Sequence, residues 1–347
     1  MSSLEGRAEG NLPPLVGHEE VLGEQLAAIH AGRAHHALCL TGPWGVGKAL
    51  AARHLGRAFL CPDRTPEGAC GACRSCRRVA LGSHPDWLEV VPSGGSARGG
   101  ISVDQIREAA ERVWLKPGEG VGRVILLDDA HLMGEVAQNA LLKTLEEPPP
   151  STLFLLVTPR TAELLPTVLS RCQVLRFAPL SREEVRRVLL SLGTWEEEDL
   201  EEALAFCEGS PGAALAFLEE EGRLLRKAAR ELLEEPPEEW DPIEKAQAVL
   251  KGGGAAKGEE GLTPSQAKRR KALLFIQLLQ QEGARAFRSS FLEGEGGAAY
   301  DPGPSREVEA WLDRCFQAEQ NILWNLDPLL VLEILLMELS RTGVPGR

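Results

Sequence analysis

A glycine-rich stretch near the N-terminus, TGPWGVGKAL at residues 41–50, contains most of a phosphate-binding loop. The pattern G-x-x-x-x-G-K-[ST] places glycines in a tight turn and a lysine on the outer phosphates of a nucleotide. Residues that fit these roles are Gly42, Gly45, Gly47 and Lys48. Ala49 stands where the pattern has the hydroxyl that holds the nucleotide's magnesium ion. The stretch therefore predicts a loop derived from a nucleotide site, the alternative being a glycine turn that fits by chance.

Two other stretches bear on whether this loop is active. In LLDDAH, Asp128 is suited to hold magnesium through water, and Asp129 occupies the place where a glutamate usually orients the attacking water. The Asp129 side chain is one methylene shorter, and small misplacements of a general base cost orders of magnitude in rate. The stretch GSPGAAL, at 209–215, offers no arginine for the outermost phosphate. These departures predict impaired ATP hydrolysis and leave open whether Lys48 still holds a nucleotide.

Four cysteines are spaced C-x8-C-x2-C-x2-C, and they are Cys61, Cys70, Cys73 and Cys76. Each x2 step allows neighbouring thiolates to turn onto one ion, and four thiolates close a tetrahedral zinc site with no open position for catalysis. A pair of disulfides, free thiols and an iron–sulfur cluster are the alternatives. The spacing therefore predicts structural zinc, while the scattered cysteines at 39, 172, 207 and 315 are expected in the core.

The composition limits the class of protein. The chain has 347 residues, enough for two or three domains, and a formal net charge of -13, which argues against tight DNA binding by the chain alone. The N-terminal stretch has no apolar segment of signal-peptide length, so a cytoplasmic protein is expected. The most apolar stretch, ILWNLDPLLVLEILLMELSR at 322–341, contains acidic residues and a proline, and a packed helix rather than a membrane span is expected.

Strand-like and helix-like segments alternate between residues 15 and 178. Short, almost wholly apolar runs at 36–42, 123–131 and 152–159 are typical of buried parallel strands, and a helical pattern closed by prolines occupies 135–150. This alternation predicts an α/β fold with a doubly wound parallel sheet. Ligands of such sheets lie at the carboxyl ends of the strands, where the loop, Asp128 and Thr158 fall.

Beyond residue 178 only helices are expected. A capping box, Ser181 with Glu184, begins the first of them, and glycine-rich interruptions at 251–264 and 293–304 separate later ones. The predicted domains are therefore an α/β domain at 1–178, a small helical domain at 179–227 and a C-terminal helical domain at 228–347. The basic run Lys268–Lys271 is expected to be a solvated helix face, with a DNA or subunit contact as the alternative.

One long stretch resembles a known family. HLMGEVAQNALLKTLEEPPPSTLFLLVT at 131–158, followed by PTVLSRC at 166–172 and accompanied by the cysteine cluster, resembles bacterial clamp-loader subunits of the AAA+ superfamily. The likeness extends strongly from residue 15 to about 215, and weakly to the C-terminal helices. It implies a P-loop domain with a zinc-binding insertion, a helical lid and a C-terminal collar that mediates oligomerisation.

The resemblance also implies a division of labour between subunits. In this family each ATP lies at a subunit boundary, and Arg171 of the SRC motif matches the arginine finger that completes the neighbouring site; a surface salt bridge is the alternative. Thr158 matches the position that senses the outer phosphate, or serves only as a capping residue. The altered loop resembles the delta-prime type of subunit, which belongs to DNA polymerase III and is not expected to hydrolyse ATP itself. An active motor subunit of the gamma or tau type is the alternative.

The implied partners are the gamma/tau motor subunits, the delta subunit and, through the assembly, the sliding clamp and primer–template DNA. A stand-alone zinc-containing DNA-binding protein is a third possibility, which the net charge of -13 disfavours. The sequence does not determine a role for Trp44 inside the phosphate loop.

Overall fold

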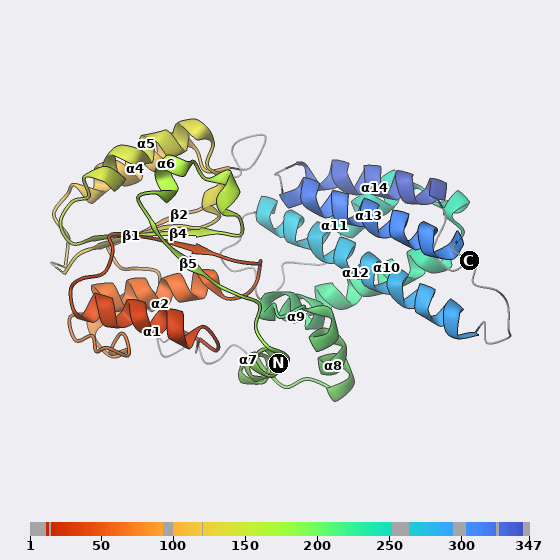
Figure 1. The fold of residues 1–347 in the computed structure, drawn as a ribbon, viewed down its shortest axis with the longest axis horizontal. Coiled ribbons are helices and arrows are strands. Elements are labelled where there is room, and N and C mark those ends of the chain that lie inside the picture. Colours follow the sequence, from red (N-terminus) through yellow and green to blue (C-terminus); the bar gives the residue numbers. More distant parts are fainter. Residues whose placement is uncertain are drawn as a thin grey trace. The chain divides into compact units, whose positions relative to one another are not determined.

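The computed structural model describes residues 12–13, 15–92, 100–119, 121–251, 264–293, 303–323 and 326–342 (Figure 1). The glycine-rich interruptions and the N-terminal stretch predicted from the sequence fall mainly outside these ranges. The chain divides into two compact units, residues 1–214 and 215–347. The finer division into three domains remains a prediction.

A five-stranded parallel sheet forms the centre of the first unit, with the strand order β2-β3-β4-β1-β5. All residues of β3 and β4 are buried, which explains why these strands are apolar throughout. The predicted doubly wound sheet is thus confirmed, with two strands more than the sequence indicated. The strands are β1 (Ala37–Thr41), β2 (Trp87–Val90), β3 (Arg123–Leu127), β4 (Thr152–Thr158) and β5 (Gln173–Arg176).

Helices cover both faces of this sheet (Figure 1). On one face lie α1 (Glu19–His30) and α2 (Lys48–Leu60), and on the other α4 (Val103–Val113), α5 (Glu135–Glu146) and the single turn α6 (Pro166–Leu169). A core of buried aliphatic side chains joins the second group of helices to the strands. The short helix α3 (Arg74–Ala80) contains the last cysteine of the cluster, Cys76. Two 3-10 turns, Ala130–Leu132 and Thr161–Glu163, come after β3 and β4.

Helices alone follow β5. The predicted capping box is present, since the Ser181 hydroxyl accepts from the Glu184 amide and the Glu184 carboxylate accepts from the Ser181 amide at the start of α7. These helices are α7 (Arg182–Leu192), α8 (Glu197–Phe206) and α9 (Pro211–Leu218). The first unit ends within α9.

The second unit is helical in its described residues. Its core contains Trp311, Phe275 and Leu336, all buried, and α13 packs against both α12 and α14. No described helix is long and apolar enough to cross a membrane. The helices are α10 (Glu220–Glu234), α11 (Pro242–Lys251), α12 (Pro264–Glu293), α13 (Gly303–Leu323) and α14 (Pro328–Thr342), with a 3-10 turn at Pro237–Glu239.

The basic run at the start of α12 is partly used inside this unit. Lys271 is buried and pairs with Glu221 at 2.6 Å, and Arg270 pairs with Glu219 at 2.9 Å. Lys268 is exposed. Half of the run therefore ties α12 to α10 instead of forming the solvated face expected from the sequence.

Candidate functional site

The glycine-rich loop connects β1 to α2 at the carboxyl end of the sheet. Gly42, Gly45 and Gly47 all have positive φ angles, of 150°, 75° and 100°. Such angles are readily accessible only to glycine, so the sequence pattern and the tight backbone path agree. The structure thus places a phosphate-type loop between a buried strand and a helix N-terminus, the arrangement that binds phosphate in many proteins.

Lys48 bonds to its own loop. Its ammonium group donates to the carbonyl oxygens of Gly42 at 2.7 Å and Pro43 at 2.5 Å, and the residue is only 6% exposed. Burial lowers the pKa of Lys48 to about 8, and the nearby charges of Asp129 and Asp128 oppose this shift. The Lys48 ammonium, which the sequence predicts to face a nucleotide, therefore donates hydrogen bonds to carbonyls of its own loop.

The N-terminus of α9 lies directly on this loop. The Ser210 hydroxyl donates to the Trp44 carbonyl at 2.9 Å, and the Gly212 amide donates to the Gly45 carbonyl at 3.0 Å. A Cβ on Gly45 would lie 2.3 Å from the Ser210 hydroxyl, and one on Gly212 would lie 2.8 Å from the Gly45 Cα. Two glycines are thus needed for this close approach, and Trp44 beside it is 42% exposed.

The acidic pair follows β3, which β4 separates from β1 in the sheet, and its charges still act on Lys48. Burial, and then the charge of Asp129, raise the pKa of Asp128 to about 7. Asp129 adopts a left-handed backbone conformation with φ 53°, and its amide donates to the Asp128 carboxylate at 3.0 Å. At the end of β4, the buried Thr158 hydroxyl donates to the Arg160 carbonyl at 2.7 Å and accepts from the Arg160 amide at 3.1 Å. Thr158 therefore caps its own turn.

Arg171 lies between α6 and β5, where three groups hold its guanidinium. It donates to the Thr167 carbonyl at 2.8 Å and to the Ser170 hydroxyl at 3.2 Å. It also pairs with the Glu146 carboxylate at 2.5 Å, and the Arg171 side chain remains 33% exposed. The guanidinium is thus oriented by the chain and accessible to solvent.

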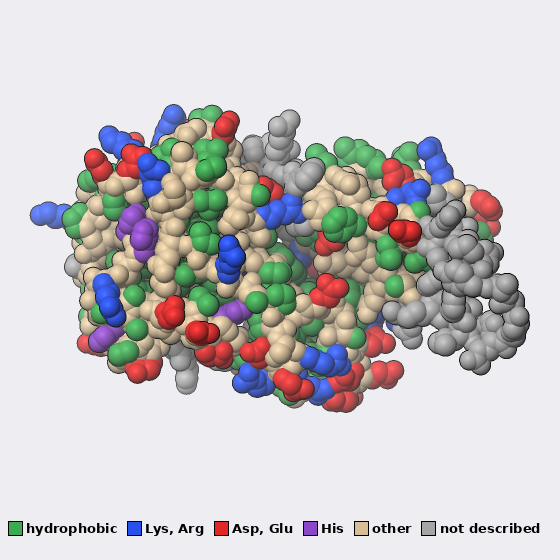
Figure 2. Space-filling view, in the orientation of Figure 1, with side chains coloured by type: hydrophobic (Ala, Val, Ile, Leu, Met, Phe, Trp, Pro, Cys, Tyr) green, Lys and Arg blue, Asp and Glu red, His purple; other side chains and the backbone are tan. Residues whose placement is uncertain are grey.

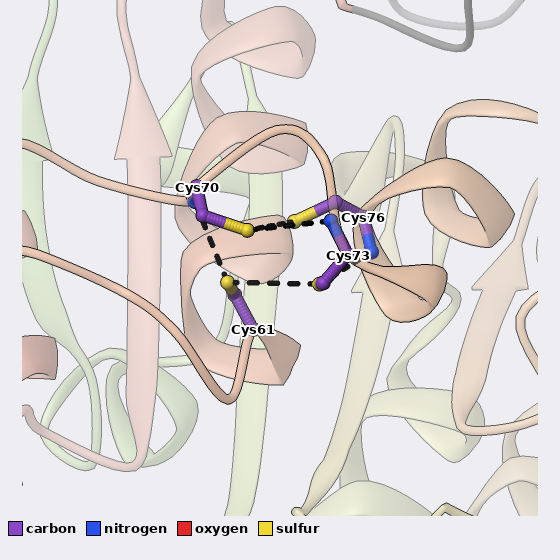
Figure 3. Close-up of side chains that lie close together, drawn as sticks. All are labelled: Cys61, Cys70, Cys73 and Cys76. Atoms are coloured by element: carbon purple, nitrogen blue, oxygen red, sulfur yellow. Dashed lines mark hydrogen bonds between the residues drawn. The ribbon is translucent and has the colours of Figure 1, made fainter.

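The four clustered cysteines converge, as their spacing predicted (Figure 3). Their Sγ atoms all lie within 4.8 Å of one another, with 3.9 Å between Cys61 and Cys73 and 4.0 Å between Cys70 and Cys76. Zinc–sulfur bonds of about 2.3 Å put the sulfurs of a tetrahedral site about 3.8 Å apart. The cluster has the dimensions to hold a metal ion such as zinc.

Backbone groups prepare this cluster for thiolates. The amides of Cys70, Cys73 and Cys76 each donate to the sulfur of the preceding cysteine of the set at 3.4 Å. The Cys73 amide, followed by that of Ala72, lowers the pKa of Cys70 to about 7, whereas burial raises the pKa of Cys61 to about 12. Amides aimed at sulfur favour the ionised ligands that a metal requires.

Comparison with known proteins finds a family that is similar to the part of the chain that carries these features. Residues 17–181 match the family model described as DNA polymerase III, delta subunit, a range that includes the loop, the cysteine cluster and Arg171. The matched range is just under half of the chain, so this part of the chain is similar to the DNA polymerase III delta-subunit family. The family resemblance expected from the sequence is thereby confirmed.

Three curated relatives illustrate the match. DNA polymerase III subunit delta' of Escherichia coli is 37% identical over 194 residues, covering 56% of this chain and 58% of that protein. Subunit delta' of Pseudomonas aeruginosa is 40% identical over 184 residues, covering 52% and 55%. Subunit tau of Escherichia coli is 35% identical over 175 residues, covering 50% and 26%. The chain therefore matches little more than half the length of these delta' relatives.

A buried ion pair near the cysteine cluster has no counterpart in the sequence prediction. Asp86, 1% exposed, pairs with Arg123 at 3.1 Å and accepts from the amides of Gly118 and Glu119 at 2.8 and 2.9 Å. Arg123 also donates to a carbonyl in the last turn of α4 and to two carbonyls of the segment that follows α4. The pair thus joins the starts of β2 and β3 to the segment that follows α4.

The cluster itself is attached to this region through Ser75. Its hydroxyl donates to the Leu60 carbonyl at 2.9 Å and lies 3.0 Å from Nε2 of the buried His84. A cavity of about 190 Å³ lies here, lined in part by Cys73, His84 and Glu119. Ser75 is 15 positions from Leu60 and nine positions from His84. The spacing of the cysteines therefore did not indicate these contacts.

Proposed function

We propose that this chain is a delta-prime-like, non-hydrolysing subunit of the DNA polymerase III clamp loader that supplies Arg171 in trans to a neighbouring ATPase subunit. The observation that carries the proposal is the state of the phosphate loop. Lys48 bonds to the carbonyls of Gly42 and Pro43, and the backbone of the loop is covered by Ser210 and Gly212.

Four features support loss of hydrolysis in the chain's own site. The Lys48 ammonium is engaged by two carbonyls of its own loop, and the start of α9 donates to the loop carbonyls of Trp44 and Gly45. Ala49 offers no hydroxyl for magnesium, and no arginine is present at 209–215. Loss of one preorganised electrostatic group typically costs about 10²–10³ in rate, so several losses together leave little activity.

The remaining useful group is Arg171. Its guanidinium is partly exposed and held in one orientation by the Thr167 carbonyl and the Ser170 hydroxyl. An arginine finger acts by meeting the charge that develops on a phosphoryl group in the transition state, and supplying one is worth about 10³–10⁵ in rate. Preorientation reduces the entropy lost when the finger engages.

The proposed partners are gamma/tau motor subunits and a delta subunit, with the sliding clamp and primer–template DNA reached through the assembly. An apolar stripe on α14 supports docking through the C-terminal helices. Leu330, Ile334 and Met337, spaced by four and three residues, are 52%, 48% and 41% exposed. This spacing puts them on one face of the helix, opposite buried neighbours such as Leu332 and Leu339.

The surface charge of the chain supports contact with DNA through the assembly and not by this chain alone. The net charge is -13, and Figure 2 shows Asp and Glu interspersed with Lys and Arg on the face in view. Independent binding to phosphate backbones requires a concentrated basic surface.

The test of the trans role is Arg171→Ala in a reconstituted complex with gamma/tau and delta subunits. Turnover at the interface that Arg171 completes should fall about 10³-fold or more, which lowers the DNA-stimulated ATPase of the whole complex. Arg107→Ala is the control, because Arg107 is an exposed arginine on α4 paired with Asp104. An Arg171→Ala complex that assembles and hydrolyses ATP at the unaltered rate contradicts the proposal.

An active motor subunit is the second candidate, favoured by the 35% identity to tau and by the presence of Lys48 and Asp128. Binding of a fluorescent ATP analogue to the isolated chain separates the two. Micromolar, magnesium-dependent binding accompanied by turnover would establish the motor and reject the non-hydrolysing subunit.

A further inference from the structure

The guanidinium of Arg171 is paired within its own chain before it meets any neighbour. Its second terminal nitrogen donates to the carboxylate of Glu146, the last residue of α5, at 2.5 Å. The two side chains are 33% and 49% exposed, and 25 residues of sequence separate them. This contact lies apart from the phosphate loop described above.

The other terminal nitrogen of Arg171 is held differently. It donates to the Thr167 carbonyl at 2.8 Å and to the Ser170 hydroxyl at 3.2 Å, both of them neutral acceptors. These acceptors fix the direction of the side chain and leave its charge intact. The Glu146 carboxylate, in contrast, neutralises the charge that a phosphoryl group would use.

We propose that Glu146 is a positioning residue that acts as a latch on Arg171, holding the guanidinium in cis until the triphosphate at the neighbouring site displaces the carboxylate. The inference rests on the proposed trans role of Arg171. A triphosphate carries more charge than one carboxylate and presents several oxygens to the guanidinium, so it competes successfully at close range. The Thr167 and Ser170 contacts remain when Glu146 is displaced, and they keep the side chain aimed.

The latch must be weak to be released. Exposed ion pairs contribute little, so loss of this one is expected to change an equilibrium by about twofold to fivefold. Glu146→Gln removes the charge, keeps the shape and retains a hydrogen-bond acceptor. Glu147→Gln is the matched control, because Glu147 is the adjacent exposed glutamate.

The first experiment uses the isolated chain. The rate at which phenylglyoxal modifies Arg171 is measured by peptide mass spectrometry in the wild type, Glu146→Gln and Glu147→Gln, with thermal unfolding confirming the fold. A carboxylate partner slows this reaction because it engages a terminal nitrogen of the guanidinium that phenylglyoxal must reach. Glu146→Gln should react about twofold to fivefold faster, the size expected for an exposed pair. Equal rates in the two glutamine variants overturn the latch.

The second experiment uses the complex reconstituted with gamma/tau and delta subunits. In Glu146→Gln the ATP concentration that gives half-maximal DNA-stimulated ATPase should fall by a similar factor, with the maximal rate changed less than about twofold. Glu147→Gln should match the wild type. An unchanged or raised half-maximal concentration in Glu146→Gln rejects the latch.

Arg171→Ala distinguishes failure of the latch from failure of the trans role. If Arg171→Ala abolishes the ATPase contribution while Glu146→Gln changes neither readout, the latch is wrong and the trans role stands. If Arg171→Ala leaves ATPase intact, the trans role fails, and with it the competition that the latch requires.

Discussion

At the scale of single residues, buried charges in this chain are compensated by specific neighbours. Lys48 donates to two loop carbonyls near the carboxylates of Asp128 and Asp129, and Asp86 pairs with Arg123 and accepts from two amides. Burial by itself opposes ionisation of Asp86, but the Glu119 and Gly118 amides and the Arg123 guanidinium outweigh it and hold its pKa below the ordinary value. The ionised form of Asp86 is therefore part of the native structure.

Asp86→Asn tests this compensation. Breaking a buried pair strands the remaining charge, and about 3 kcal/mol of unfolding free energy should be lost at pH 7. Because the folded-state pKa is depressed, the contribution of Asp86 is complete above its unfolded pKa of about 4 and disappears as the pH falls through the folded-state value. Urea unfolding should show wild type and variant far apart at pH 7 and converging in acid.

Asp104→Asn provides the comparison for that experiment. Asp104 also pairs with an arginine, but its side chain is 86% exposed, so a change within about 0.5 kcal/mol is expected. A difference between wild type and Asp86→Asn that stays constant with pH would show that the carboxylate charge is not the source of the stability.

At the scale of elements, the cysteine module joins the end of α2 to α3. Cys61 immediately follows α2, and Cys73 caps α3, its sulfur accepting from the Cys76 amide. In the segment between Cys61 and Cys73, an isolated antiparallel β-bridge pairs Thr65 with Gly68. A metal ion would cross-link this segment where regular backbone hydrogen bonding is sparse.

Cys73→Ser should therefore release zinc and lower the melting temperature of the first unit. Structural zinc contributes folding free energy directly, so loss of one ligand of four is expected to cost several degrees or more. Atomic spectroscopy on the purified chain measures the metal. Cys315→Ala, which alters a buried thiol of α13, should retain zinc; equal zinc in wild type and Cys73→Ser would refute the four-thiolate site.

At the scale of the whole molecule, two units with different surfaces share one chain. The first unit contains the loop, the cysteine module and Arg171, while the second presents the apolar stripe on α14. Exposed apolar residues aligned on one helix face are typical of interaction surfaces. This arrangement supports the proposal that one part of the chain assembles and another part completes a neighbour's site.

Ile334→Glu tests the assembling part. A charge in the middle of the stripe should leave the isolated chain folded, because Ile334 is 48% exposed, and should weaken incorporation into the complex about tenfold or more. Size-exclusion chromatography with gamma/tau and delta subunits measures incorporation. Arg341→Gln, on the same helix, should incorporate normally, and normal incorporation of Ile334→Glu would exclude the stripe as a docking surface.

Much of this architecture could be predicted from the sequence because its signals are contiguous. The glycine loop, the x2 cysteine steps and the strands at the centre of the sheet are each written in a few neighbouring residues, and a buried parallel strand must be apolar along its length. The strands β2 and β5 escaped prediction because each has only four residues and lies at a sheet edge, where exposed residues interrupt the apolar pattern.

The tertiary structure alone decided which distant groups meet. Asp86 pairs with Arg123, Glu146 pairs with Arg171 and Gly212 donates to Gly45, although these residues are 37, 25 and 167 positions apart. No local propensity encodes such pairs, because they depend on which elements the sheet order and the helix packing bring together. The sequence thus determined the kinds of groups available, and the packing of strands and helices determined what each group touches.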